Sequence, residues 1–91
     1  MKINEAEKLH KKIIRFARKY FTEHGWKSII MEVSLNLRFR GHTWKKIGEA
    51  NARHPSQCRQ RVLKALEIAP YAKDIENTDV QNYKLMYLRM K

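Results

Sequence analysis

The sequence predicts an all-α fold: a small helical domain with a tri-helical helix-turn-helix core between an N-terminal and a C-terminal helix. Apolar residues recur at helical spacing along most of the chain, and the one segment that alternates has no second strand to pair with. Gly25, Gly41 and Pro70 stand between the periodic segments, where helices end. With 91 residues the chain is long enough for one compact core, so residues 1–91 are expected to form a single domain.

The first helix is predicted over residues 4–23. Asn4 can cap its start, and Glu7 follows three residues later, which is the spacing of a capping box. Gly25 supplies a left-handed end. Lysines and arginines cover most of the helix surface, and a single apolar stripe predicts the face that packs. The members of that stripe are Leu9, Ile13, Phe16, Ala17 and Tyr20.

Residues 26–40 allow two interpretations. At period two, the apolar residues from Ile29 to Phe39 alternate with mostly polar neighbours, which is typical of a strand. At period 3.6 they form two stripes on opposite sides of a helix, which suits a helix lying centrally in the domain. One stripe holds Trp26, Ile29, Ile30, Val33 and Leu37, and the other holds Met31, Leu35 and Phe39. We favour the helix, because a lone strand would have to pair across a dimer.

Residues 43–68 have the pattern of a helix-turn-helix unit. Together with the preceding segment they form the predicted tri-helical core over about residues 26–69. Thr43 can cap a short helix whose inward residues are Trp44, Ile47 and Ala50. Residues 51–54 are predicted to form a tight turn, and Pro55 suits the first turn of the next helix because its missing N–H loses no hydrogen bond there. That helix is predicted to bury Cys58, Val62, Ala65 and Leu66.

A last helix is predicted over about residues 78–90, with Thr78 as its cap. Its apolar residues are distributed most of the way round the helix. They are Val80, Tyr83, Leu85, Tyr87 and Leu88. A helix of this kind packs on its own domain or on a second copy, so it is the predicted contact of a homodimer.

The charge is the strongest compositional signal. Lys and Arg number 20 against 9 Asp and Glu, for a formal net charge of +11 and a pI near 10.1. Such a chain repels itself and attracts polyanions, among which nucleic acid rewards clustered cations through counterion release. Together with the helix-turn-helix pattern, this favours duplex DNA over RNA as the partner.

Residues 55–64, in the helix after the turn, are the predicted recognition helix that would enter the major groove. If Cys58 and Val62 face the core, helical geometry turns polar side chains outward, including the arginine and glutamine types that pair bidentately with guanine and adenine. The predicted base contacts are Ser56, Gln57, Arg59 and Gln60. The predicted phosphate contacts are Lys45, Lys46, Arg53, Arg61, Lys64, Lys11, Lys12 and Arg15.

Residues 44–48 (WKKIG) and 53–61 (RHPSQCRQR) resemble a Myb/SANT-type repeat, in which a tryptophan and an isoleucine precede the turn and an Arg-x-x-x-Gln-Cys-Arg-x-Arg run opens the recognition helix. Trp26 stands about where the first tryptophan of that family would. The resemblance implies that Trp26, Trp44 and Cys58 are core residues and that Ser56, Gln57, Arg59 and Gln60 face DNA. Two features depart from the family: Val62 replaces its third tryptophan, and the acidic cluster that opens its first helix is absent.

Other classes of function find little support in the sequence. No catalytic Ser-His-Asp set or glycine-rich phosphate loop is present, so we predict a non-enzymatic protein without a cofactor or small-molecule substrate. His54 and Cys58 lack a second pair of ligands, which argues against a metal site, and the other histidines, His10, His24 and His42, are predicted to lie on the surface. A lone cysteine, no signal peptide and no membrane-spanning run predict an intracellular location, in cytoplasm, nucleoid or nucleus.

Two alternatives remain open at this point. If residues 29–39 are a strand, the chain resembles a ribbon-helix-helix dimer that reads DNA with that strand. The other alternative is a small basic structural subunit of an RNA–protein or protein assembly, in which the positive surface binds RNA without reading sequence.

Overall fold

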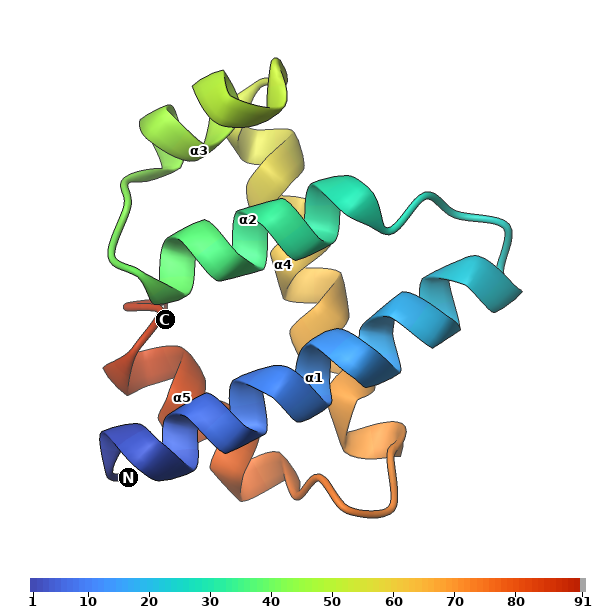
Figure 1. Ribbon diagram of the computed structural model, residues 1–91, viewed down its shortest axis with the longest axis vertical. Helices are drawn as coiled ribbons and strands as arrows, with labels where there is room; N and C mark the ends of the chain where they lie inside the picture. The colour runs from blue at the N-terminus through green and yellow to red at the C-terminus, as the bar shows by residue number, and fades with distance from the viewer. Residues whose placement is uncertain (91) are drawn as a thin grey trace.

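The computed structural model describes residues 1–90, and within them every regular element is helical (Figure 1). This confirms the predicted all-α fold. The helices are α1 (Ile3–Glu23), α2 (Ile29–Phe39), α3 (Trp44–Asn51), α4 (Pro55–Ile68) and α5 (Asn77–Met86), with a 3-10 turn, η1 (Ala69–Tyr71), after α4.

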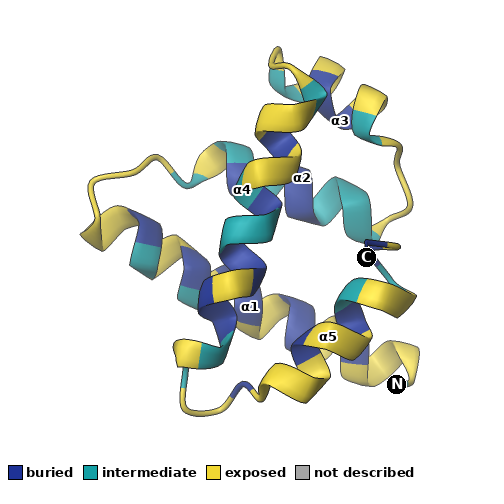
Figure 2. Ribbon diagram, turned by 180° about the vertical axis from the view of Figure 1, so that it is seen from behind, coloured by how far each residue is buried: buried dark blue, intermediate teal, exposed yellow. Residues whose placement is uncertain are grey.

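The helices α2, α3 and α4 pack on one another as the predicted tri-helical core. In Figure 1, α1 and α2 lie side by side in front of α4, and α5 lies below, next to the first half of α1. Seen from behind, α4 and α5 are in front (Figure 2), and buried residues line the side of each helix that faces its neighbours. The four residues predicted for the inner face of α4 are all buried: Cys58, Val62, Ala65 and Leu66.

The segment with two interpretations is a helix. Met31, Ser34 and Leu35 of α2 are buried between α1 and the α3–α4 pair. The other predicted stripe is only partly covered, and Ile29 is 66% exposed. Because no strand exists in residues 1–90 to enter a groove, the ribbon-helix-helix alternative is wrong.

Three predicted helix ends differ from the structure. The helix α1 begins at Ile3, so Asn4 lies inside the first turn and the predicted capping box does not form. The helix α5 begins at Asn77, which leaves Thr78 inside it, and ends at Met86 instead of residue 90. Short polar residues occur inside first turns as well as at caps, so pattern alone misplaces an end by a residue or more.

Gly25 ends α1 as predicted, with φ +74°. The amide of Trp26 donates to the carbonyl of Phe21 at 2.8 Å, and the amide of Gly25 donates to that of Thr22 at 3.1 Å. These two bonds form a Schellman motif, which closes the end of the helix and fixes the position of the Trp26 backbone.

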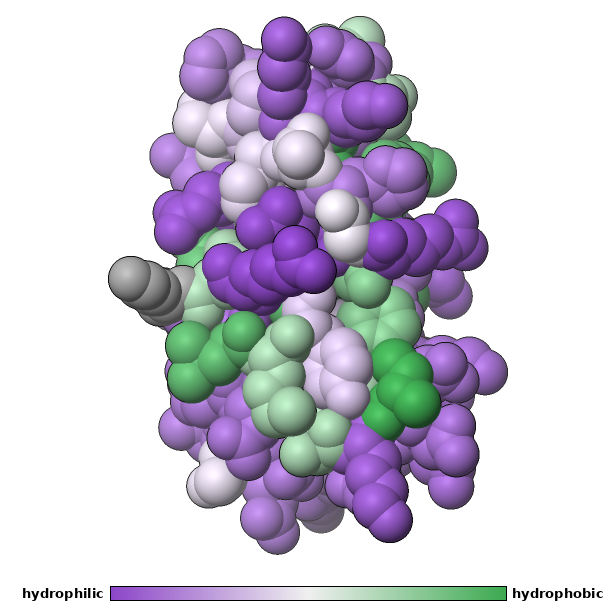
Figure 3. Space-filling view, turned by 90° about the vertical axis from the view of Figure 1, so that its left-hand side faces the viewer, coloured by the Kyte–Doolittle hydropathy of each residue, from purple (hydrophilic) through white to green (hydrophobic). Residues whose placement is uncertain are grey.

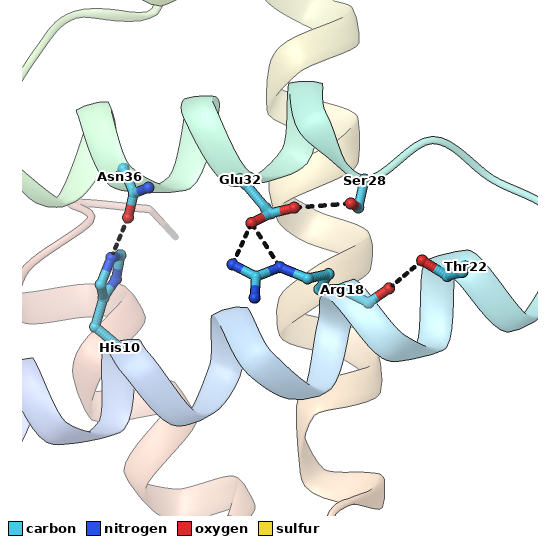
Figure 4. A network of polar contacts seen from close by, with 6 residues as sticks. All are labelled: His10, Arg18, Thr22, Ser28, Glu32 and Asn36. Carbon is cyan, nitrogen blue, oxygen red and sulfur yellow. Dashed lines mark hydrogen bonds and ion pairs between the residues drawn. The ribbon is translucent and has the colours of Figure 1, made fainter.

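Polar contacts join α1 to α2 on the front of the molecule (Figure 4). The guanidinium of Arg18 donates to the Glu32 carboxylate at 2.9 and 2.6 Å, and Ser28 donates to the other carboxylate oxygen at 2.7 Å. Partial burial opposes ionisation of Glu32, but these hydrogen bonds and the nearby positive charge hold its pKa below the ordinary value. The carboxylate therefore stays charged and ties the two helices together.

His10 is not on the surface, contrary to the prediction. It is 9% exposed, stacks on Phe39 with ring centroids 4.4 Å apart, and bonds to two other helices. Nε2 lies 2.6 Å from Asn36 Oδ1, and Nδ1 lies 2.5 Å from the hydroxyl of Tyr83. A neutral ring with its proton on Nε2 satisfies both contacts, because Tyr83 then donates to Nδ1.

We expect stability to fall on acidification between about pH 7 and pH 5 because of His10. Burial, together with the charge of Arg40, lowers the pKa of His10 from 6.5, although its bond to Asn36 opposes the shift. Below pH 6.5 His10 therefore binds a proton more readily in the unfolded chain than in the folded chain, and the free energy of unfolding decreases. Urea melts over this range, with His10→Gln alongside, measure the effect.

The variant His10→Gln cannot titrate, so its stability should be lower at neutral pH but much flatter with pH. His24 is exposed, and His24→Gln is the matched control that should keep the wild-type pH dependence. If the free energy of unfolding changes with pH equally in the wild type and in His10→Gln, the pH dependence does not come from His10.

Candidate nucleic-acid interface

The unit α3–turn–α4 is built by local signals that the sequence contains. The hydroxyl of Thr43 accepts from the Lys46 amide at 3.2 Å, which confirms the predicted cap of α3. Pro55 occupies the first turn of α4, also as predicted. Between the helices Ala52 adopts a left-handed conformation (φ 52°, ψ 41°), and the amide of Arg53 donates back to the Gly48 carbonyl at 3.0 Å. The turn is therefore short and closed by its own backbone.

Gly48 is the residue that lets α3 approach the start of α4. A Cβ atom at this position would lie 2.7 Å from the carbonyl oxygen of Arg53 and 3.0 Å from the ring of Pro55. Glycine removes that clash, so the two helices meet closely and α4 leaves the turn in a fixed direction. Ile47 beside it is fully buried, while Ala50, predicted to face inward, is exposed, and Asn51 of the same turn donates to the buried Ser34 hydroxyl at 3.2 Å.

All four predicted base-contacting side chains lie exposed on the first two turns of α4. They are Ser56, Gln57, Arg59 and Gln60. A contact that the sequence analysis missed holds the first of them: Nδ1 of His54 accepts from the Ser56 amide at 3.2 Å and lies 2.7 Å from its hydroxyl. His54 thus acts as the cap of α4, a role in which Ser, Thr, Asp or Asn are the usual signals.

Five predicted phosphate contacts lie on α3, in the turn and along α4. Lys45 and Lys46 are exposed on α3, Arg53 is exposed in the turn, and Arg61 and Lys64 are half-buried along α4. Residues 43–64 contain six basic side chains and one acidic side chain, Glu49. Within residues 1–90, Lys64 is the only one of the six in an ion pair, with Glu67 at 3.8 Å. The surface around the start of α4 is therefore strongly positive.

The three predicted contacts on α1 lie elsewhere. Lys11 and Arg15 line a groove between α1 and α2, the layer that faces the viewer in Figure 1, whereas α4 lies behind it. Lys12 is 3.7 Å from Asp74, in the segment after η1. The structure brings Gln60 together with Arg53, Arg61 and Lys64 around one hollow beside α4, and Lys11, Lys12 and Arg15 do not line that hollow.

The two tryptophans are less buried than the resemblance implies. Trp26 is 44% exposed because it precedes α2 instead of lying within it, and it packs edge-on against Phe21 with centroids 5.5 Å apart. Trp44 is half-buried under the guanidinium of Arg38, which lies 4.7 Å from the ring centroid. Arg38 also donates to the carbonyls of His42 and Leu88, so it ties the segment before α3 to the segment after α5.

Comparison of the chain with protein-family models, curated proteins and solved structures gave no match. Among residues 1–90, no three His, Cys, Asp or Glu side chains gather as metal ligands, and no helix has the length and apolar content needed to cross a membrane. The site is thus described by its own geometry: an exposed polar helix start, held at a fixed angle and surrounded by cations.

Proposed function

We propose that the protein is a non-enzymatic binder of double-stranded DNA, a transcriptional regulator or architectural protein, which places the first half of α4 in the major groove. The observation that carries the proposal is the exposed, carboxylate-free start of α4 with Arg59 and Gln60 on it, projecting from a tri-helical core. A major groove admits one helix, and the side chains that reach base edges come from the start of that helix.

In this arrangement some side chains contact base edges and read the sequence, and others contact phosphates and position the helix. Arg59 and Gln60 can each make two hydrogen bonds to one base edge, Arg to guanine and Gln to adenine. Gln57 and Ser56 precede them on the same exposed helix start. The cations on α3, in the turn and along α4 bind phosphates, which sets the position of α4 without reading sequence. The Myb-like order of residues 53–61 agrees with this division and is part of the proposal.

We expect Arg59→Ala and Gln60→Ala each to weaken discrimination at one base pair by about 1–3 kcal/mol, because each removes a bidentate contact. Selection from a randomised duplex library, followed by binding to the selected site and to a scrambled site, measures this. Both variants should keep weak, salt-sensitive binding to any duplex. Gln81→Ala, which changes an exposed glutamine on α5, is the matched control and should keep the full preference.

The competing function is a structural subunit that uses its charge alone. Binding that is uniform across duplex sequences, or that RNA displaces more readily than DNA, would contradict sequence reading by α4. In that outcome the small basic subunit of an RNA–protein or protein assembly becomes the better explanation.

The proposal includes a homodimer through α5. Leu85 and Met86 are 56% and 54% exposed, and the terminal amine of Met1 lies 3.7 Å from the Met86 sulfur. Figure 3 shows apolar side chains gathered on the side of the molecule that carries the N-terminus and the end of α5. Large exposed apolar residues of this kind mark interaction sites when they cluster.

We expect wild-type protein to sediment as a dimer and Leu85→Lys and Met86→Lys to sediment as monomers, since a buried lysine would oppose the contact. Sedimentation at several protein concentrations measures the oligomeric state of each protein. Tyr71→Lys, at an exposed position after α4, is the control and should leave the dimer intact. A wild-type chain that stays monomeric with and without DNA would contradict this part of the proposal.

A further inference from the structure

A pocket of about 460 Å³ lies beside α4, between its middle turns, the end of α1 and the segment that leads into α2. Four of the side chains that line it are cations from three parts of the chain: Lys27, Arg53, Arg61 and Lys64. None of its lining residues is acidic. Four like charges around one hollow repel one another, so an anion entering it would be held by all of them.

The wall opposite α4 is aromatic. Trp26 stands there with its backbone fixed by the Schellman motif and its ring supported by Phe21 and by His24, whose ring centroid is 5.1 Å away. Nζ of Lys64 lies 5.8 Å from the Trp26 ring centroid, across the pocket. The ring is thus held in place before any ligand arrives, and the Lys64 ammonium lies over it.

The combination of an aromatic plane with several cations selects a particular ligand chemistry. Inorganic anions would use the cations and leave Trp26 in water, whereas a nucleotide supplies both a flat base and phosphate oxygens. Gln60 also lines the pocket, and its amide can donate and accept hydrogen bonds at a base edge. A nucleotide thus offers a partner to the Trp26 ring, to the Gln60 amide and to the cations of the pocket.

We propose that this pocket binds one unstacked nucleotide, with its base against Trp26 and its phosphate among Arg53, Arg61, Lys64 and Lys27. The nucleotide has two sources: an unpaired stretch of a strand whose duplex part lies on α4, or a free nucleotide. The first source rests on the proposed DNA binding, because Arg53, Gln60, Arg61 and Lys64 belong to both surfaces. The second source is independent of it.

The test uses the full chain and 2-aminopurine, a fluorescent analogue of adenine. Three probes are titrated at constant ionic strength: the free 2-aminopurine deoxyribonucleoside monophosphate, a blunt duplex, and the same duplex with a short single-stranded overhang that contains 2-aminopurine. We expect saturable binding of the free nucleotide, or about tenfold tighter binding of the overhang duplex than of the blunt one, with quenching of the probe.

Two variants and one control make the assignment specific. Trp26→Ala should abolish the free-nucleotide binding or the overhang advantage and leave the affinity for the blunt duplex unchanged. Lys27→Ala, at an exposed position that is no part of the α4 interface, should reduce the same effect without affecting the fold. Tyr71→Ala removes an exposed aromatic ring that does not line the pocket and should behave as wild type.

The outcomes separate the pocket from the proposed function. An overhang advantage without free-nucleotide binding assigns the strand as the source, and the reverse result assigns a free nucleotide. If wild-type protein shows neither effect, or if the effect survives both Trp26→Ala and Lys27→Ala, the pocket proposal is overturned. Failure to bind the blunt duplex would instead overturn the proposed function, and the free-nucleotide probe would still decide the pocket.

Discussion

The affinity for duplex DNA should fall about 500-fold between about 50 and 200 mM salt. Each phosphate neutralised on B-DNA contributes about −0.9 to the slope of log K against log salt, and the α3–turn–α4 unit carries five predicted phosphate contacts, which gives a slope of about −4.5. Lys45→Ala combined with Lys46→Ala should reduce the slope by about 1.8. The loss should be the same for the selected and the scrambled site, because phosphate contacts carry no sequence information. Binding isotherms across a salt series measure both quantities.

The cations of α1 provide the matched control for this experiment. The triple variant Lys11→Ala, Lys12→Ala, Arg15→Ala removes one more charge than the α3 pair, but Lys11 and Arg15 line the groove between α1 and α2, and Lys12 lies beside Asp74. If the position of the cations determines the salt dependence, the triple variant keeps the wild-type slope of log K against log salt. If net charge alone decides, it loses more slope than the α3 pair, and the assignment of the interface to α3 and α4 fails.

The parts of the fold that the sequence predicted well are those built from short-range signals. Thr43, Pro55 and Gly25 act on the backbone within a few residues of themselves, so their roles as cap, first-turn residue and helix end were visible in the pattern. The buried face of α4 followed from its period in the same way. The exposed positions of Arg59 and Gln60 are a consequence of that face.

Contacts between distant residues were not predictable in this way. His10 is buried because Asn36 and Tyr83, 26 and 73 residues away in sequence, meet it from two other helices. Trp26 is 44% exposed because it lies in the connection before α2, although Phe21, His24 and Lys64 approach its ring. The pocket beside α4 combines residues from three segments, so spacing along the chain held no sign of it. Burial of a polar residue or exposure of an aromatic one depends on packing, which local pattern does not encode.

Gly48→Ala should destabilise the protein by about 2 kcal/mol, although glycine inside a helix is usually less favourable than alanine by about 1 kcal/mol. The added Cβ would lie 2.7 Å from the backbone carbonyl oxygen of Arg53, which cannot move aside as a side chain could. Either the bond from the Arg53 amide to the Gly48 carbonyl breaks, or α4 moves away from α3. For a domain of this size the loss corresponds to a fall in Tm of about 8–16 °C, which calorimetry would measure.

Ala52→Gly is a control of opposite sign in the same turn. Ala52 holds a left-handed conformation that strains an L-residue by about 1–2 kcal/mol, so glycine should raise stability, by less than that amount because it also loosens the unfolded chain. Gly48→Ala adds a methyl group close to the backbone of Arg53. Ala52→Gly removes a methyl group from a residue with a strained backbone conformation. Stabilisation by Gly48→Ala would mean that α3 and the start of α4 do not approach this closely. The direction in which α4 presents Arg59 and Gln60 would then have to be revised as well, since it is set by that approach.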